Sequence, residues 1–120
     1  MPPTPELPLS PLTMSILLAL AGGDKHGYAL MQEIDEQTEG ALRPGTGSLY
    51  AALQRLLDEG LITDSAKARP AGEDARRKTF RITPAGRAAA RAEVARMVRV
   101  LEHARTTSLV RHLPLLEDGR

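Results

Sequence analysis

The 120-residue sequence has no cysteine and no tryptophan, and its aromatic residues are two tyrosines and one phenylalanine. The lack of cysteine excludes disulfides, thiolate metal sites and cysteine nucleophiles. With so few aromatic side chains, a core must be built from Leu, Ile, Val, Met and Ala, which favours helices. A chain of this length is predicted to form one domain with a modest core.

Long hydrophobic runs are also absent. The apolar run 14–21 is shorter than the ~20 residues that cross a bilayer. It follows a proline-rich, acidic leader rather than the basic segment of a secretion signal. The sequence therefore predicts a cytoplasmic protein with no membrane partner.

Elements of an enzyme active site are missing too. His26, His103 and His112 lie far apart and show no metal-ligand spacing. There is no Gly-rich phosphate loop with its lysine, and no acidic pair backed by a histidine. We therefore expect no metal, no cofactor and no catalysis, with His26 serving a structural role near a helix start.

Charge is nearly balanced overall, with a formal net charge of +1, but it is unevenly distributed. Segment 24–39 is acidic and segment 67–81 is basic. Such asymmetry can mark a nucleic-acid-binding surface, although a run of charge is more often a solvated face, and composition alone favours that second interpretation. The cations of the basic segment are Lys67, Arg69, Arg76, Arg77, Lys78 and Arg81.

Punctuation by proline, glycine and hydroxyl residues predicts three helices in the first half of the chain. Residues 1–9 form a proline-rich leader that we expect to be flexible. Ser10 before Pro11 is typical of a helix start, and the apolar helix 12–21 should lie centrally. A second helix is predicted over 26–38, with Asp24 as its cap and Gly40 ending it.

The stretch PGTGSLYAALQRLLDEGLI predicts the third helix, over 46–59. Its leucines recur at helical spacing and form one inward face, and Gly60 suits a left-handed position after the helix. Two strands, 61–69 and 77–83, should follow as a hairpin with basic flanks. In the second strand, Phe80 and Ile82 should face one side and Thr79 and Arg81 the other.

Thr83 and Pro84 predict the start of a long last helix that ends near Arg105. An apolar seam with spacing 4, 3, 4, 3 runs along it, widened by Val98 and Val100, and favours pairing with a second copy of the chain. Packing of this helix on its own domain is the alternative. The seam residues are Ala90, Val94, Met97, Leu101 and Ala104.

The predicted fold is therefore mainly α with a β-hairpin: a winged helix-turn-helix followed by a long C-terminal dimerisation helix. In a helix-turn-helix, the helix after the turn enters the major groove of DNA. We predict a leader over 1–9, a DNA-binding domain over 10–83, a dimerisation helix over 84–105 and a short tail over 106–120.

Three segments, HGYALMQEI (26–34), PGTGSLYAALQRLLDEGLI (44–62) and RRKTFRITPAGR (76–87), resemble the PadR family of bacterial transcriptional regulators. The resemblance covers about residues 16–105. It implies a winged helix-turn-helix homodimer that binds a palindromic operator, usually as a repressor, and that a hydrophobic or phenolic effector can release. The short tail resembles the short subfamily. The absence of tryptophan from the last helix argues against an aromatic sandwich for a drug.

The resemblance also implies DNA-facing positions. Thr46, Ser48, Tyr50 and Gln54 lie on the matching recognition helix, and Tyr28 matches a position near phosphate. The basic hairpin matches the wing, where Lys67, Arg76, Arg77 and Lys78 are the expected contacts.

Each residue also has a structural alternative. Thr46 and Ser48 could merely cap the helix, Tyr50 could be an amphipathic boundary residue, and Gln54, suited to pair with adenine, could be solvated. Arg43 could approach phosphate or face solvent, and Arg55 could reach the DNA backbone or pair with Glu59.

Two functions compete. The first is a dimeric DNA-binding regulator whose partners are double-stranded DNA, a second copy of the chain and a small-molecule effector. Met97, Val98 and Leu101 would line the effector pocket. The second is a winged-helix protein-interaction module without direct DNA binding, since a fold does not fix a function.

Overall fold

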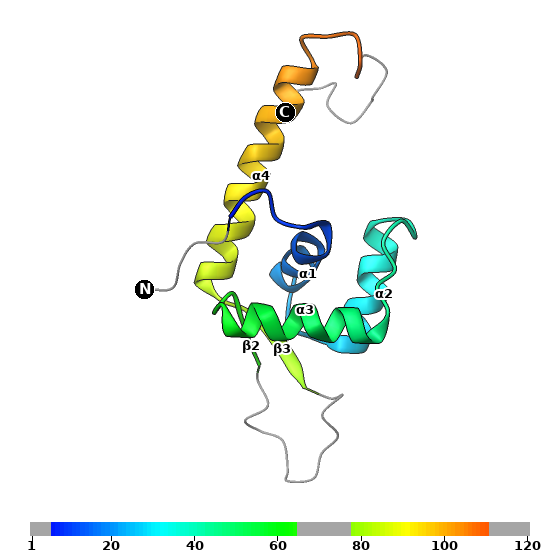
Figure 1. Cartoon of the computed structure of the whole chain (residues 1–120), viewed down its shortest axis with the longest axis vertical. Coiled ribbons are helices and arrows are strands. Elements are labelled where there is room, and N and C mark those ends of the chain that lie inside the picture. The colour runs from blue at the N-terminus through cyan, green and yellow to red at the C-terminus, as the bar shows by residue number, and fades with distance from the viewer. Residues whose placement is uncertain (1–5, 65–77, 111–120) are drawn as a thin grey trace.

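The computed structural model describes residues 6–64 and 78–110. Three helices and a small sheet form a body from which the last helix projects (Figure 1). The order is helix, short strand, two helices, two strands and a long helix. The elements are α1 Pro11–Ala21, β1 Lys25–His26, α2 Gly27–Gln37, α3 Thr46–Asp58, β2 Ile62–Asp64, β3 Thr79–Ile82 and α4 Pro84–Ala104.

Helix α1 is the centre of the body, as its nearly uninterrupted apolar sequence predicted. Ile16, Leu17 and Leu20 are fully buried, and α1 packs against α2, α3, α4 and β3. Its start is also as predicted, because the Ser10 side chain accepts a hydrogen bond from the N–H of Thr13. The other helices and the sheet thus pack around one central apolar helix.

The cap of α2 differs from the prediction. His26 Nδ1 accepts the N–H of Ala29 at 3.4 Å, so His26 is the N-cap and has the structural role expected of it. Asp24 is not the cap, because its carboxylate binds both Nε and Nη2 of Arg81 at 3.0 and 2.9 Å. An arginine fork on the sheet outcompetes a backbone N–H for this carboxylate.

Strand β1 was not predicted. It pairs antiparallel with β3 and makes a three-stranded sheet in the order β1-β3-β2. The predicted faces of β3 are confirmed, since Phe80 and Ile82 are buried and Arg81 is exposed. The predicted first strand is observed as Ile62–Asp64, and its continuation to 69 and the turn 70–75 lie outside the described residues.

The start of α4 is fastened to the end of α3. Thr83 caps α4 by accepting the Gly86 N–H, while its own hydroxyl donates to the Gly60 carbonyl at 2.7 Å. The Thr83 N–H donates to the Leu61 carbonyl at 3.1 Å. Gly60 has φ 76°, the left-handed conformation that the sequence predicted. The Gly-Leu pair after α3 is therefore the joint on which α4 rests.

The last residue of the predicted leader packs in the core, which the sequence did not predict. Leu9 is 9% exposed and belongs to the core. Its backbone N–H lies near the carboxylate of Glu93 in α4 and helps to lower the pKa of that carboxyl, so the segment just before α1 lies close to α4. Beyond α4, residues 106–110 form turns, and the rest of the tail lies outside the described part of the chain.

Candidate nucleic-acid interface

The N-terminus of α3 carries no side-chain cap. Its N-cap is Gly45, and the first helical hydrogen bond runs from the Leu49 N–H to the Gly45 carbonyl. The N–H groups of Thr46, Gly47 and Ser48 precede that bond, and all three residues are exposed. The alternative that Thr46 and Ser48 merely cap the helix is therefore wrong. An uncapped helix start attracts anions, because its N–H groups carry partial positive charge.

The rest of α3 divides into a buried and an exposed face. Leu49, Ala52, Leu53 and Leu56 are buried. Gln54 lies on the exposed face, where its Nε2 donates to Asp58 Oδ1 at 3.0 Å. The amide of Gln54 is thus held along the helix surface in the free protein, so base pairing would require it to leave Asp58.

Arg55 contacts the start of α1, a partner that the sequence did not predict. Its Nη2 donates to Thr13 Oγ1 at 3.4 Å, next to the cap of α1. Glu59 is not its partner among the described residues. The Arg55 side chain is exposed and marks the edge of α3 that faces the start of α1.

Tyr50 lies at the opposite edge of α3 and is half-buried, as an amphipathic boundary residue would be. Its ring packs against the core, and a Cβ at Gly27 would overlap its hydroxyl, so Tyr50 also touches the start of α2. A small hollow of about 100 Å³ lies beside it, between α3 and the sheet. Its lining is Tyr50, Leu53, Gln54, Leu57, Lys78 and Phe80.

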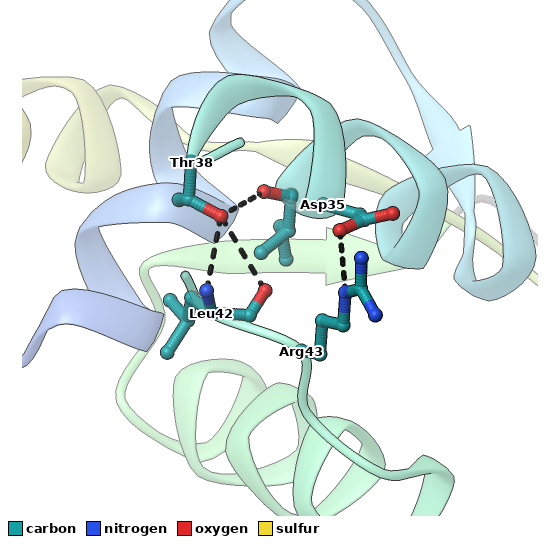
Figure 2. A network of polar contacts seen from close by, with 5 residues as sticks. Asp35, Thr38, Leu42 and Arg43 are labelled. Carbon is teal, nitrogen blue, oxygen red and sulfur yellow. Dashed lines mark hydrogen bonds and ion pairs between the residues drawn. The ribbon is translucent and has the colours of Figure 1, made fainter. Parts of the chain in front are cut away.

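A larger hollow of about 380 Å³ lies between α2 and the connection to α3. Tyr28 is 65% exposed on its rim, and Gln32 Nε2 approaches the Tyr28 hydroxyl at 3.5 Å. Arg43 Nε binds Asp35 Oδ1 at 2.9 Å (Figure 2). The lining residues are Tyr28, Met31, Gln32, Asp35, Arg43 and Pro44. Arg43 is therefore held by a carboxylate, which the sequence did not reveal.

Of the predicted wing cations, only Lys78 lies in the described part of the chain. Its Nζ is 3.8 Å from Asp64 Oδ2 on the neighbouring strand β2. Lys67, Arg69, Arg76 and Arg77 lie outside the described residues.

Arg81, the remaining cation of the basic segment, is bound to Asp24. The hydrogen bond and the charge of Arg81 lower the pKa of Asp24, and the same contact raises the pKa of Arg81. Arg81 therefore joins β3 to the turn before β1.

The predicted dimer seam of α4 is only partly free. Ala90 is 8% exposed because it packs in the core of its own subunit, so its assignment to the seam is corrected. From Val94 onward the apolar residues are accessible, and Leu101 and Ala104 are half-buried. The exposed large apolar side chains of α4 are Val94, Met97, Val98 and Val100.

Two polar clusters escaped the sequence reasoning. Lys25 Nζ donates to the Ala19 carbonyl at 2.8 Å and pairs with Glu33 at 3.4 Å, which places a cation at the C-terminal end of α1, where the helix dipole favours it. In α4, Glu93 is 1% exposed and binds Arg96 through both carboxylate oxygens at 2.9 Å. The i, i+3 spacing of Glu93 and Arg96 is visible in the sequence, but the burial of Glu93 is not.

In residues 6–64 and 78–110, none of the helices has the length and apolar composition needed to cross a bilayer. Within the same residues, no group of three His, Asp or Glu side chains is placed to hold a metal ion.

Three helices followed by strands β2 and β3, with α3 exposed beside the sheet, define the winged helix-turn-helix class. The sequence model of the PadR-like family of transcriptional regulators matches residues 16–92. The chain belongs to that family, as the sequence predicted, and the family is one of regulators rather than enzymes.

Several known proteins resemble the chain in sequence or in fold. An uncharacterised 37.1 kDa protein in transposon TN4556 of Streptomyces fradiae is 44% identical over 87 residues, which are 72% of this chain but 23% of that protein. A transcriptional regulator from Clostridium thermocellum has a similar structure, with a TM-score of 0.64, 26% identity and coverage of 79% of this chain and 87% of the other.

Bacillus subtilis PadR, solved in complex with operator DNA, has a TM-score of 0.61 and 23% identity. The similarity covers 72% of this chain and 48% of that protein. At this identity the likeness concerns the fold. The chain spans about a quarter of the length of the curated relative that it matches.

Proposed function

We propose that the protein is a sequence-specific, homodimeric transcriptional repressor that acts in the cytoplasm and binds a palindromic operator. The observation that carries this proposal is the uncapped, exposed N-terminus of α3, supported from behind by four buried apolar residues. Small residues and free N–H groups at that end allow a DNA backbone to approach closely.

Direct reading of bases falls to the exposed face of α3 in this proposal. Gln54 would leave Asp58 and pair with adenine in the major groove. Phosphates would be contacted by residues that lie at the edges of α3 or on the rim of the larger hollow. These residues are Thr46, Ser48, Tyr28, Tyr50, Arg43 and Arg55. Lys67, Arg76, Arg77 and Lys78 of the wing would add affinity that is independent of sequence.

Dimerisation in this proposal uses the accessible half of α4. Val94, Met97, Val98, Leu101 and Ala104 would face the same residues of a second copy, across a two-fold axis. The two α3 helices would then enter major grooves about 34 Å apart. A small hydrophobic effector that releases DNA would bind between the paired helices, beside Met97, Val98 and Leu101.

Fluorescence anisotropy across a salt series, with DNA from upstream of the protein's own gene, tests the proposal. We expect sequence-selective, steeply salt-dependent binding with two subunits per site. Gln54→Ala should change sequence preference, whereas Arg76→Ala should weaken binding about equally on all sequences and flatten the salt slope by about one unit.

A failure to bind any DNA at low salt, together with a co-purifying protein, would instead support an interaction module. If Arg76→Ala altered specificity alone, the roles given to the wing and to α3 would be wrong.

A further inference from the structure

Arg43 lies two residues before the N-cap of α3 and forms an ion pair with Asp35 of α2. The Nε–Oδ1 distance is 2.9 Å, and the side chains are 72% and 46% exposed, respectively. Both line the 380 Å³ hollow that Tyr28 and Gln32 also line. An accessible cation close to the start of α3 is thus bound to a carboxylate that a phosphate could replace.

The backbone that carries Arg43 is fixed to the end of α2. Thr38 Oγ1 donates to the Ile34 carbonyl at 2.8 Å and accepts the Leu42 N–H at 3.1 Å, so it clamps the connection (Figure 2). The Arg43 guanidinium also passes over Gly40, where a Cβ would lie 3.0 Å from Nη2. The Arg43 side chain therefore lies over the end of α2, beside Asp35.

We propose that Asp35 is an internal competitor for DNA phosphate. In the free protein, Asp35 binds the Arg43 guanidinium. When DNA binds, the guanidinium leaves this carboxylate and binds a backbone phosphate instead. An exposed ion pair is weak, so the exchange is feasible, and arginine matches phosphate geometry well. Asp35 thereby lowers the affinity for DNA of every sequence. This inference rests on the proposed DNA binding.

Asp35→Asn tests the competition, with Glu36→Gln as the matched control. Glu36 is the next residue of α2, is exposed, and makes no side-chain hydrogen bond or ion pair in the described structure, so its variant removes the same charge without freeing Arg43. Binding to a labelled mixed-sequence duplex is measured by anisotropy in a salt series. Asp35→Asn should tighten binding about two- to fivefold more than Glu36→Gln.

Arg43→Gln completes the cycle. It should weaken binding and reduce the salt slope by about one unit, because one phosphate contact is lost. In the Arg43→Gln background, Asp35→Asn should raise the affinity for DNA no more than Glu36→Gln does.

Three outcomes would overturn the inference. The first is weaker binding by Asp35→Asn, the second is a gain equal to that of Glu36→Gln, and the third is an unchanged gain without Arg43. In all three the wild-type protein still binds the duplex, so the proposed function stands. A wild-type protein that binds no duplex at low salt refutes both. Thermal unfolding of each variant confirms that the fold is intact.

Discussion

At the scale of single residues, Gly86 shows how closely two backbones meet. A Cβ at this position would overlap the Leu61 carbonyl oxygen and lie 2.9 Å from Ile82 Cγ1. The obstacle is backbone rather than the end of a flexible side chain, so the start of α4 would have to move. Gly47, in α3, is the opposite case, since a Cβ there would meet nothing within 4 Å.

We expect Gly86→Ala to lower the free energy of unfolding by about 1–3 kcal/mol, because overpacking forces a backbone shift. Gly47→Ala is the control and should leave stability unchanged or raise it by about 0.4–1 kcal/mol, since alanine restricts the unfolded chain. Urea unfolding followed by circular dichroism measures both. Equal stability of the two variants would contradict the close approach at Gly86.

The charge of Glu93 contributes to stability through the groups that contact its carboxylate, chiefly Arg96. Hydrogen bonds from Arg96 lower the pKa of the Glu93 carboxyl, burial raises it, and the Leu9 N–H lowers it further, with a net lowering. A carboxyl whose pKa is lower in the folded state stabilises the fold above its unfolded pKa of ~4.3. That contribution is lost as the pH falls through the folded pKa.

Glu93→Gln should therefore be less stable than the wild-type protein at neutral pH, and the difference should shrink as the pH falls below about 4. Urea unfolding of both proteins at a series of pH values measures the difference in free energy of unfolding. Glu102→Gln, on an exposed site of α4, is the control and should follow the wild-type curve. A difference that stays constant with pH would show that Glu93 acts through packing alone.

At the scale of elements, α4 consists of two halves with different surroundings. Its first half is packed on the body through Ala89 and Ala90 and through the buried Glu93. Its second half leaves the body and exposes Val94, Met97 and Val98. An apolar stripe on a projecting helix is stabilised when it is buried against a partner.

We expect Met97→Lys to weaken self-association at least about tenfold, because an unpaired charge would be buried between the two α4 helices. Sedimentation equilibrium measures the dissociation constant. Arg99→Ala, roughly 140° around the helix from Val94 at 3.6 residues per turn, is the control and should leave it unchanged. A monomeric wild-type protein would remove the basis for the proposed dimer.

Sequence patterns predicted the elements that local chemistry determines. Ser10 and Thr83 begin helices because a hydroxyl can cap and the following proline needs no N–H partner, and both caps are observed. Strand β1 could not be predicted, because a two-residue strand has no alternation to detect and exists only through its pairing with β3.

In the candidate site, tertiary contacts decide what the sequence leaves open. The Arg43–Asp35 pair depends on how the chain turns after α2. Likewise, the burial of Ala90 depends on where α4 docks, and not on its place in the heptad. Helical spacing predicts which residues of α4 lie on one apolar stripe. It does not predict which part of that stripe packs against the rest of the same subunit.

At the scale of the whole molecule, the balanced charge hides local pairing. The acidic segment 24–39 looks repulsive to DNA in the sequence. In the structure Asp24 binds Arg81, Glu33 binds Lys25, and Asp35 binds Arg43. These contacts neutralise part of the acidic segment next to α3. A net charge of +1 is therefore a poor guide to the field that a nucleic acid would meet.

The joint between α3 and α4 has a mechanical consequence. The Thr83 hydroxyl and N–H bind two successive carbonyls immediately after α3, and Gly86 leaves no space for sliding there. The start of α4 is thus fixed to the end of α3. In the proposed dimer, a small change in the angle at which the two α4 helices cross would move the two α3 helices closer together or further apart. That crossing angle would then set the spacing between the two half-sites that the protein binds.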